Sequence, residues 1–478
     1  MTKIILDKYQ KKVIKNKSQN LLVIAGAGSG KTLTIIYKIK ELIKKDIKEK
    51  EILCITYTKE AATSLKEKLK KEKIYLEVKT FHGLGYQIIR NSQKTSIIDD
   101  KFLDELIMKY LSNYPKLNLL INAPFKNLGK GNFDKLQNSI LKNTIYITYL
   151  KENIKTFINL FKSNNYNIED FNKFMKQNKK ENTIKKKIRH QKFLYLVKKI
   201  YKEYEEYLKE TNQIDFHDMI NIGTEIIKKE GIYPYKYIIV DEYQDTSLSK
   251  CLLIKEIQNK TKAKLLAVGD DWQSIYRFTG SNLEIFTNFK KYFKGAKIIK
   301  LKYTYRNSME LLKVTNKFIM KNPYQIKKKI ISQKHQQYPI KIYYYKDKNE
   351  IEKILRNYKT ETFILGRNNK DINKIKNKSK NIKCLTVHKS KGLESENVII
   401  VNLENSITSF PNKIKENEYL KYVIPKEDNY IFAEERRLFY VALTRAKNTV
   451  TLLVKKDNPS YFVTELLKDS SQYIKEMN

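Results

Sequence analysis

Leu21-Leu22-Val23-Ile24-Ala25-Gly26-Ala27-Gly28-Ser29-Gly30-Lys31-Thr32 decides the fold, because an apolar run leads into a glycine-rich turn and a helix-forming segment follows. A strand, such a turn and a helix are the setting of a phosphate-binding loop. Glycines let successive N–H groups point at phosphate oxygens, while Lys31 adds a charge and Thr32 offers a hydroxyl to Mg²⁺. A chance glycine-rich turn is the alternative, and the flanking strand and helix disfavour it. We predict that a nucleoside triphosphate with Mg²⁺ binds to Ala25, Gly26, Ala27, Gly28, Ser29, Gly30, Lys31 and Thr32.

A second segment, Ile238 to Thr246, places two carboxylates directly after an apolar strand. Asp241 is positioned to hold Mg²⁺, and Glu242 to orient and deprotonate the attacking water. A strand followed by two acids occurs in many folds. Combined with the phosphate loop, it indicates hydrolysis of the nucleotide.

A third segment, Leu265 to Phe278, places a polar side chain close to two aromatic ones. Gln273 precedes Tyr276 by three residues, so one short loop can contact both a phosphate and a stacked ligand. Taken alone, the segment also fits aromatic side chains that fill the base of a sheet.

The charge of the chain is strongly positive, with 95 Lys and Arg against 52 Asp and Glu and a formal net charge of +43. Such an excess favours a polyanionic partner such as nucleic acid. The abundance of Lys, Ile, Asn and Tyr also fits an A+T-rich genome, so net charge alone is weak evidence. Arginine is scarce and therefore more informative, because a planar bidentate donor suits phosphate. The arginines in or beside motif segments are Arg277, Arg306, Arg367, Arg436, Arg437 and Arg445.

The three cysteines, Cys54, Cys251 and Cys384, are too few and too scattered for a disulfide framework or a zinc site. The first residues carry no signal-peptide pattern, and no apolar run approaches the roughly 18 residues of a membrane span. We expect a soluble protein of the cytoplasm without a membrane partner.

Short apolar strands alternate with helical patterns, which predicts parallel α/β sheets. Residues 91–210 carry almost no strand signal and are rich in Lys, Asn, Leu and Phe, so we expect a helical insertion there. The expected strands are 21–24, 52–57, 237–240, 265–268, 298–301, 362–365, 384–387, 398–401 and 450–454.

Together these segments resemble the superfamily 1A DNA helicases of the UvrD/Rep type, and within that family its helicase IV branch, chiefly through Val268 to Phe278. The resemblance runs from Leu6 to Leu466, with the motifs in family order. It implies the α/β class, with two RecA-like P-loop NTPase domains and a helical insertion in the first. Because the stretch from Arg306 to His388 is short, the accessory insertion in the second is expected to be reduced or absent. The implied divisions are residues 1–90 with 211–295, the insertion 91–210, and residues 296–470.

The same resemblance implies that the nucleotide is ATP. Gln10 matches the family's adenine-contacting glutamine, Tyr305 the residue that stacks on adenine, and Glu394 the acid that contacts the ribose. Arg306 matches an arginine that reaches the γ-phosphate, and Arg445 the arginine finger of the second domain, which ties hydrolysis to closure of the cleft. The implied catalytic residues are Lys31, Asp241, Glu242, Gln273, Arg306 and Arg445, with Thr32 and Asp241 on the metal.

Single-stranded DNA is the partner that the resemblance implies, because aromatic faces accept any base. The matching contact positions are Tyr57, Phe81, His82, Tyr276, Phe278 and His388. His82 taken alone fits a structural histidine better, and its motif context makes the DNA contact an equally good interpretation. The chain departs from many relatives at Leu33 and Thr279, where they have arginine, and at Phe278, where they have tryptophan.

The function expected from these residues is an ATP-dependent 3′→5′ translocase and helicase on single-stranded and on tailed or forked duplex DNA, in repair, recombination or replication. We assume a monomer. An alternative is an ATP-gated remodelling subunit that acts with a protein partner, such as an RNA polymerase or a defence nuclease. A scaffold without turnover is disfavoured, because the implied catalytic residues are all present.

Overall fold

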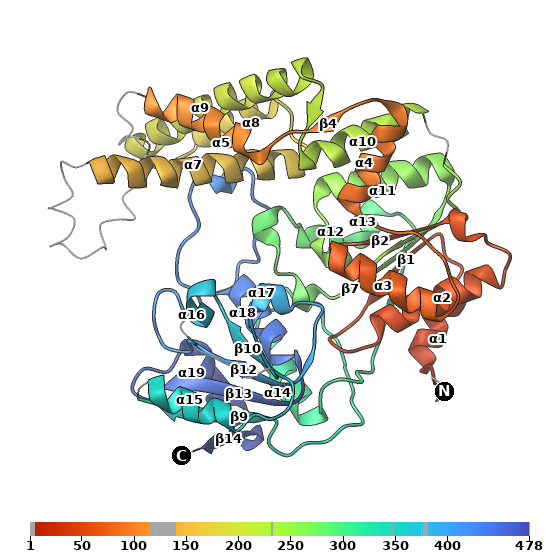
Figure 1. Cartoon of the computed structure of the whole chain (residues 1–478), viewed down its shortest axis with the longest axis vertical. Coiled ribbons are helices and arrows are strands. Elements are labelled where there is room, and N and C mark those ends of the chain that lie inside the picture. The colour runs from red at the N-terminus through yellow and green to blue at the C-terminus, as the bar shows by residue number, and fades with distance from the viewer. Residues whose placement is uncertain are drawn as a thin grey trace.

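The computed structural model describes residues 5–114, 120, 140–230, 233–346, 348–373, 375 and 381–477. Two parallel β-sheets form the centres of two lobes, and a bundle of helices lies above them (Figure 1). The predicted α/β class with parallel sheets is confirmed.

The first lobe contains a six-stranded sheet in the order β3-β2-β6-β7-β1-β8, with every neighbouring pair parallel. Strands of such a sheet are buried on both faces and therefore form continuous apolar runs. In β1, Leu22 and Ile24 join one buried cluster, and Leu21 and Val23 join the cluster on the opposite face. The strands are β1 (Asn20–Ile24), β2 (Ile52–Thr56), β3 (Val78–Thr80), β6 (Tyr237–Val240), β7 (Lys264–Gly269) and β8 (Lys297–Lys300).

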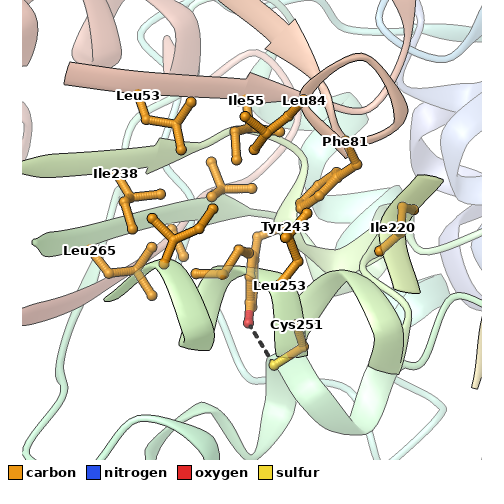
Figure 2. Packing of buried hydrophobic residues seen from close by; sticks show 14 of the residues in the cluster. Leu53, Ile55, Phe81, Leu84, Ile220, Ile238, Tyr243, Cys251, Leu253 and Leu265 are labelled. Atoms are coloured by element: carbon orange, nitrogen blue, oxygen red, sulfur yellow. Dashed lines mark hydrogen bonds between the residues drawn. The ribbon is translucent and has the colours of Figure 1, made fainter. Parts of the chain in front are cut away.

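Helices cover both faces of this sheet. The face of Leu21 packs on α1 (Lys8–Lys15), α2 (Lys31–Ile43) and α3 (Lys59–Lys71). Figure 2 shows the other cluster, in which Leu53, Ile55 and Leu265 of the strands meet Phe81, Leu84 and Leu253. Its helices are α4 (Phe81–Ser92), α10 (Phe216–Glu230), α11 (Leu248–Thr261), α12 (Leu283–Thr287) and α13 (Phe289–Tyr292).

The second lobe contains a six-stranded parallel sheet in the order β11-β10-β12-β13-β9-β14. Two of its strands, β9 and β14, were absent from the expected set. The strands are β9 (Ile340–Tyr345), β10 (Thr362–Gly366), β11 (Ile382–Thr386), β12 (Ser395–Ile400), β13 (Ala446–Lys455) and β14 (Ile474–Met477). The helices of this lobe are α14 (Met309–Ile319), α15 (Lys348–Arg356), α16 (Asn369–Asn373), α17 (Val387–Ser390), α18 (Ala433–Leu443) and α19 (Tyr461–Ser470).

The helical bundle consists of α5 (Asp100–Ser112), α7 (Ile140–Ser163), α8 (Asp170–Asn178) and α9 (Ile184–Glu210) in the part of the chain that is described. It has its own buried cluster, which includes Phe157, Phe161 and Phe193. At its base β4 (Ser96–Ile97) pairs with β5 (Gln213–Ile214). The predicted insertion also covers 115–119 and 121–139, which lie outside the described residues.

A segment of the second lobe reaches the bundle. We call residues 412–430, between β12 and α18, the strap. Its Tyr419, Tyr422 and Val423 belong to the buried cluster of the bundle. In Figure 1 this blue segment lies under α7. A bilayer-spanning helix would need a longer apolar stretch than any described helix has.

Candidate functional site

Most of the predicted nucleotide-binding residues line a cavity of about 700 Å³ between the two lobes, whereas Gln10, Ala25 and Gly26 do not line it. The phosphate loop, residues 27–32, forms one wall together with Glu242 and Gln273. The second lobe and the segment that leads into it supply Tyr305, Arg306, Glu394 and Arg445. The fold therefore places charged groups from both lobes around one cavity.

The local geometry of the loop suits phosphate. Gly28 and Gly30 have φ values of 68° and 76°, in the left-handed region that side chains other than glycine rarely adopt. A Cβ at Gly28 would also come within 2.7 Å of the Thr304 hydroxyl. Helix α2 begins at Lys31 without a side-chain cap, so its first N–H groups are open to an anion.

Ala25 and Gly26, the first two residues of the predicted phosphate loop, do not line this cavity. Ala25 is fully buried, and its N–H donates to the Gly269 carbonyl at 2.9 Å, so the residue is still part of the sheet. Gly26 faces Ile330, which packs directly against it. The loop lines the cavity only from Ala27 onward, and phosphate binding by Ala25 and Gly26 stays a prediction.

The two acids after β6 have different environments. Lys31 Nζ lies 3.1 Å from a carboxylate oxygen of Glu242, and Gln244 Nε2 donates to the other at 2.6 Å. Although burial opposes ionisation, Lys31 and Lys391 hold the pKa of Glu242 at about 2. Burial and the charge of Glu242 raise the pKa of Asp241 to about 6. Both acids are thus mainly carboxylates at neutral pH, and Glu242 has the lower pKa because Lys31 and Lys391 stabilise its charge.

The predicted metal ligands fit Mg²⁺ in chemistry. Thr32 offers a hydroxyl, and Asp241 offers a buried carboxylate whose raised pKa a divalent cation would lower. Mg²⁺ takes few protein ligands when phosphates complete its shell. No group of three or more His, Cys, Asp or Glu side chains among the described residues forms a metal cluster of its own.

The opposite wall carries two arginines. Arg306 Nε lies 2.9 Å from Glu394, and its NH1 donates to the Thr444 carbonyl at 3.1 Å. Arg445 is almost fully buried and donates to Gln273 Oε1 at 2.9 Å. Burial and the charge of Arg306 lower the pKa of Arg445 to about 9. A polyanion between the arginines would relieve their repulsion.

Gln10 and Tyr305 lie together beside Gly30. Gln10 is fully buried, its Nε2 donates to the Ser29 carbonyl at 3.4 Å, and its Oε1 accepts the Asp7 N–H. Tyr305 is 48% exposed, and its hydroxyl donates to Asp7 at 2.8 Å. Tyr305 thus has a free face for a purine, whereas the amide of Gln10 is engaged in the capping box of α1.

The predicted DNA-contacting residues form a row of rings across both lobes. Tyr57 stacks on Tyr276 with centroids 5.2 Å apart. Tyr276 donates to the His388 carbonyl at 3.1 Å, and Phe278 lies edge-on to the His388 ring at 5.5 Å. Phe278 is 51% exposed, so its face is open to a base. Burial lowers the pKa of His388 to about 4, which leaves the ring neutral at physiological pH.

Phe81 does not belong to this row. It is 3% exposed and lies in the core of the first lobe (Figure 2), because α4 begins at Phe81 and Thr80 caps it. The expectation that Phe81 stacks on a base was therefore wrong. His82 lies beside the half-exposed ring of Phe216 at 6.0 Å, and burial together with the charge of Lys250 lowers its pKa to about 3.

Comparison with known proteins shows the family. The model of the UvrD/REP helicase N-terminal domain matches residues 6–294, and that of the UvrD-like helicase C-terminal domain matches residues 363–457. The chain belongs to the UvrD/REP helicase family. The predicted resemblance is confirmed.

The similar proteins of this family are named as DNA helicases, and several of them as ATP-dependent DNA helicases. DNA helicase IV of Escherichia coli (strain K12) is 28% identical over 97% of this chain and 70% of the relative. The Rep helicase of Buchnera aphidicola subsp. Acyrthosiphon pisum is 32% identical over 88% of this chain and 61% of the relative. The PcrA helicase of Bacillus subtilis (strain 168) is 27% identical over 72% of this chain and 43% of its own length. The chain thus spans only part of these helicases.

Two lysines of this UvrD-like site were missed in the sequence. Lys391 Nζ lies 2.5 Å from Asp245, donates to the Gln273 carbonyl at 2.6 Å and lies over the Tyr276 ring. Lys250 lies over the Tyr57 ring at 4.4 Å. Lysine is so common in this chain that neither residue stood out. The sequence could have indicated a role for Lys391, since it lies three residues before Glu394 in a predicted motif.

Proposed function

We propose that this chain is a motor that hydrolyses ATP to move 3′→5′ along single-stranded DNA and separates the duplex ahead of it. The observation that carries the proposal is a single segment, 270–278, that contacts both sites. Its Gln273 accepts a hydrogen bond from Arg445, while its Tyr276 stacks on Tyr57 and donates to His388. A shift of Gln273 when ATP binds or is hydrolysed can therefore be passed along this segment to the ring of Tyr276.

The catalytic roles follow from the geometry of the cavity. Glu242 takes the proton of the attacking water, and Lys31, Arg306 and Arg445 stabilise the charge of the transferred phosphoryl group. Thr32 and Asp241 would hold Mg²⁺, which when bound would neutralise phosphate charge. Because Arg445 comes from the second lobe, hydrolysis requires that the cleft be closed.

The same proposal includes a division into domains. Residues 1–90 with 211–295 form the first RecA-like domain, residues 91–210 the helical insertion, and residues 296–470 the second RecA-like domain. Two strands lie beyond these boundaries: β8 (Lys297–Lys300) pairs with β1 in the first sheet, and β14 extends to Met477 in the second.

Unwinding of tailed duplexes tests the function. We expect the purified chain to unwind duplex DNA with a 3′ tail and not with a 5′ tail, and its ATPase activity to rise when single-stranded DNA is added. An ATPase rate that is unaffected by DNA would contradict the proposal, and unwinding of the 5′-tailed substrate alone would reverse the polarity.

A second candidate is a remodelling subunit that acts with a protein partner such as an RNA polymerase or a defence nuclease. A hollow of about 690 Å³ between α5 and α9 favours it, because Tyr110, Tyr114, Tyr195 and Leu196 line it and Tyr195 is 57% exposed. Exposed apolar surface of this kind marks interaction sites. Efficient unwinding by the purified monomer would rule this candidate out.

A further inference from the structure

The strap is held in the bundle by buried contacts. Tyr419 stacks on Phe193 with ring centroids 3.8 Å apart and an interplanar angle of 2°. The Tyr422 hydroxyl lies 2.8 Å from His190 Nδ1, and Asn164 Nδ2 donates to the Val423 carbonyl at 2.8 Å. Tyr419 and Tyr422 are 2% and 4% exposed. The middle of the strap is therefore part of the bundle core rather than a loop resting on it.

Both ends of the strap are fixed to the motor lobes. Arg277, which follows Tyr276 in the first lobe, pairs with Glu416 and Glu427 of the strap and lies 3.0 Å from Glu434 of α18. Arg437 of α18 lies 2.8 Å from Asp428 of the strap. Charged contacts thus link the strap to the segment that connects the ATP cavity with the aromatic row.

A cavity of about 890 Å³ lies between the strap and the DNA-contacting residues. Phe278 and His388 line one side, and strap residues 412–416 line the other. Lys413 and Lys415 in this stretch are exposed. A strand that stacks on Phe278 and contacts His388 therefore has the strap across from it. The cavity is also lined by glutamates, which are paired with arginines: Glu416, Glu427 and Glu434 with Arg277, and Glu435 with Arg367.

We propose that the strap closes the DNA groove into a ring, so that a bound single strand is encircled by the first lobe, the bundle, the strap and the second lobe. This inference rests on the proposed function. The bundle is joined to the first lobe by the chain on both sides, and residues 301–308 join the two lobes. Along the described chain, two non-covalent contacts of the strap therefore complete the ring: its contact with the bundle, and the pairs of Glu416 and Glu427 with Arg277 of the first lobe.

Encirclement has a topological consequence. A strand with a free end can thread through a closed ring, but a covalently closed circle can enter only when the strap leaves the bundle. Loading on a circle therefore requires that Tyr419 and Tyr422 leave the bundle and that Glu416 and Glu427 leave Arg277. A strand once inside leaves only past an end or after the ring opens again.

A crosslink between strap and bundle tests this. Glu181 and Lys421 form an ion pair across the contact, so Glu181→Cys with Lys421→Cys can be joined by a short bismaleimide. Cys54 and Cys251 are buried, and Cys384→Ser removes the half-exposed native thiol. The matched control is Lys317→Cys with Asp469→Cys, which joins α14 to α19 within the second lobe.

When crosslinked before DNA is added, the protein is expected to bind linear single-stranded DNA but to lose at least tenfold in binding to circles of the same sequence. When crosslinked after loading, it should stay on circles through a high-salt wash and leave once the circle is cut. The control crosslink should change neither result. Equal binding of circles and linear strands by the crosslinked protein would overturn the proposal. If the protein without a crosslink binds neither form, the proposed function fails and the ring fails with it.

A second variant tests the proposal independently, in case the protein with the cysteine pair does not fold or does not react with the crosslinker. Tyr419→Leu removes the stack on Phe193 while keeping an apolar side chain. We expect its dissociation from circular DNA to be about tenfold faster than that of the unaltered protein, with nucleotide affinity unchanged. An unchanged dissociation rate would contradict the ring.

Discussion

Glu242 is the proposed catalytic base, and its backbone has an uncommon conformation. Its φ of 51° falls in the left-handed region, which residues other than glycine seldom occupy and which is found at functional sites. The conformation turns its carboxylate toward Lys31 and Gln244.

Replacement of Glu242 by glutamine tests its role as the base. The amide keeps the shape of the side chain but cannot take a proton, so we expect ATP turnover to fall by roughly 10²- to 10⁴-fold while ATP and DNA still bind. Phosphate release and fluorescence anisotropy measure the two properties. Glu225→Gln on the exposed face of α10 is the matched control, and rapid turnover by Glu242→Gln would show that another group is the base.

Lys328 is a positioning residue below the cavity. Its side chain is 2% exposed and pairs with both Asp270 and Asp271. Asp270 in turn accepts a hydrogen bond from Gln273 Nε2 at 2.5 Å, and Gln273 accepts one from Arg445. The charge of Lys328 thus holds the glutamine that the arginine finger contacts.

Removal of this charge should affect both stability and catalysis. Lys328→Met leaves buried carboxylates unpaired, so we expect a loss of about 3 kcal/mol in the free energy of unfolding. We also expect kcat for ATP to fall more than KM rises, with partial rescue by Lys328→Arg. Urea denaturation and steady-state ATPase measure the two effects, with the exposed Lys329→Met as control. A normal kcat in a folded Lys328→Met protein would show that the role is only structural.

Among the elements, buried strands were the most predictable. The apolar runs around Leu22 and Ile239 are continuous because parallel strands are covered on both faces. Strand β9 was missed because Ile340-Lys341-Ile342 alternates apolar and charged residues, which was not recognised as a strand although it pairs with β13 in the sheet. The period-2 pattern was the available signal.

Helix α11 carries a residue whose charge should depend on pH. Burial lowers the pKa of Lys250 to about 8, and this lysine lies over the Tyr57 ring in the DNA groove. Because the ammonium is charged below its pKa and neutral above it, DNA affinity should weaken as pH rises from 7 to 9, and DNA binding should take up a proton in that range.

Fluorescence anisotropy with a short oligonucleotide measures this dependence. We expect Lys250→Met to bind more weakly at pH 7 and to lose the pH dependence, whereas Lys260→Met on the same helix should keep it. The histidines should add little, since the pKa values of His82 and His388 are about 3 and 4. If Lys250→Met shows the same pH dependence of DNA affinity as the unaltered protein, another group causes that dependence.

At the scale of the whole molecule, Lys391 is one of the residues that make polar contacts between the two lobes. Lys391 of the second lobe pairs with Asp245 at 2.5 Å and donates to the Gln273 carbonyl at 2.6 Å, both in the first lobe. It also lies over Tyr276. Lys391 therefore contacts the hydrolysis segment and the aromatic row at once.

Loss of Lys391 should uncouple these two parts. We expect Lys391→Met to reduce the stimulation of ATPase by single-stranded DNA about tenfold, because a buried charge pair between the lobes is broken. ATPase rates with and without oligonucleotide measure the stimulation, and Lys389→Met is the matched control. If single-stranded DNA stimulates the ATPase of Lys391→Met fully, residues other than Lys391 couple DNA binding to hydrolysis.

The sequence by itself determined the phosphate loop, the two acids after β6, the parallel α/β class and the family, because each depends on a short local pattern of residue types. It could not reveal that Phe81 is buried, that the Ala25 N–H bonds to Gly269, or that Lys328 and Lys391 contact the segment that carries Gln273. The strap was equally hidden, since Tyr419 and Phe193 are far apart in the chain. Only the tertiary structure decided these points, because burial and long-range pairing depend on which surfaces the folded lobes and bundle bring together.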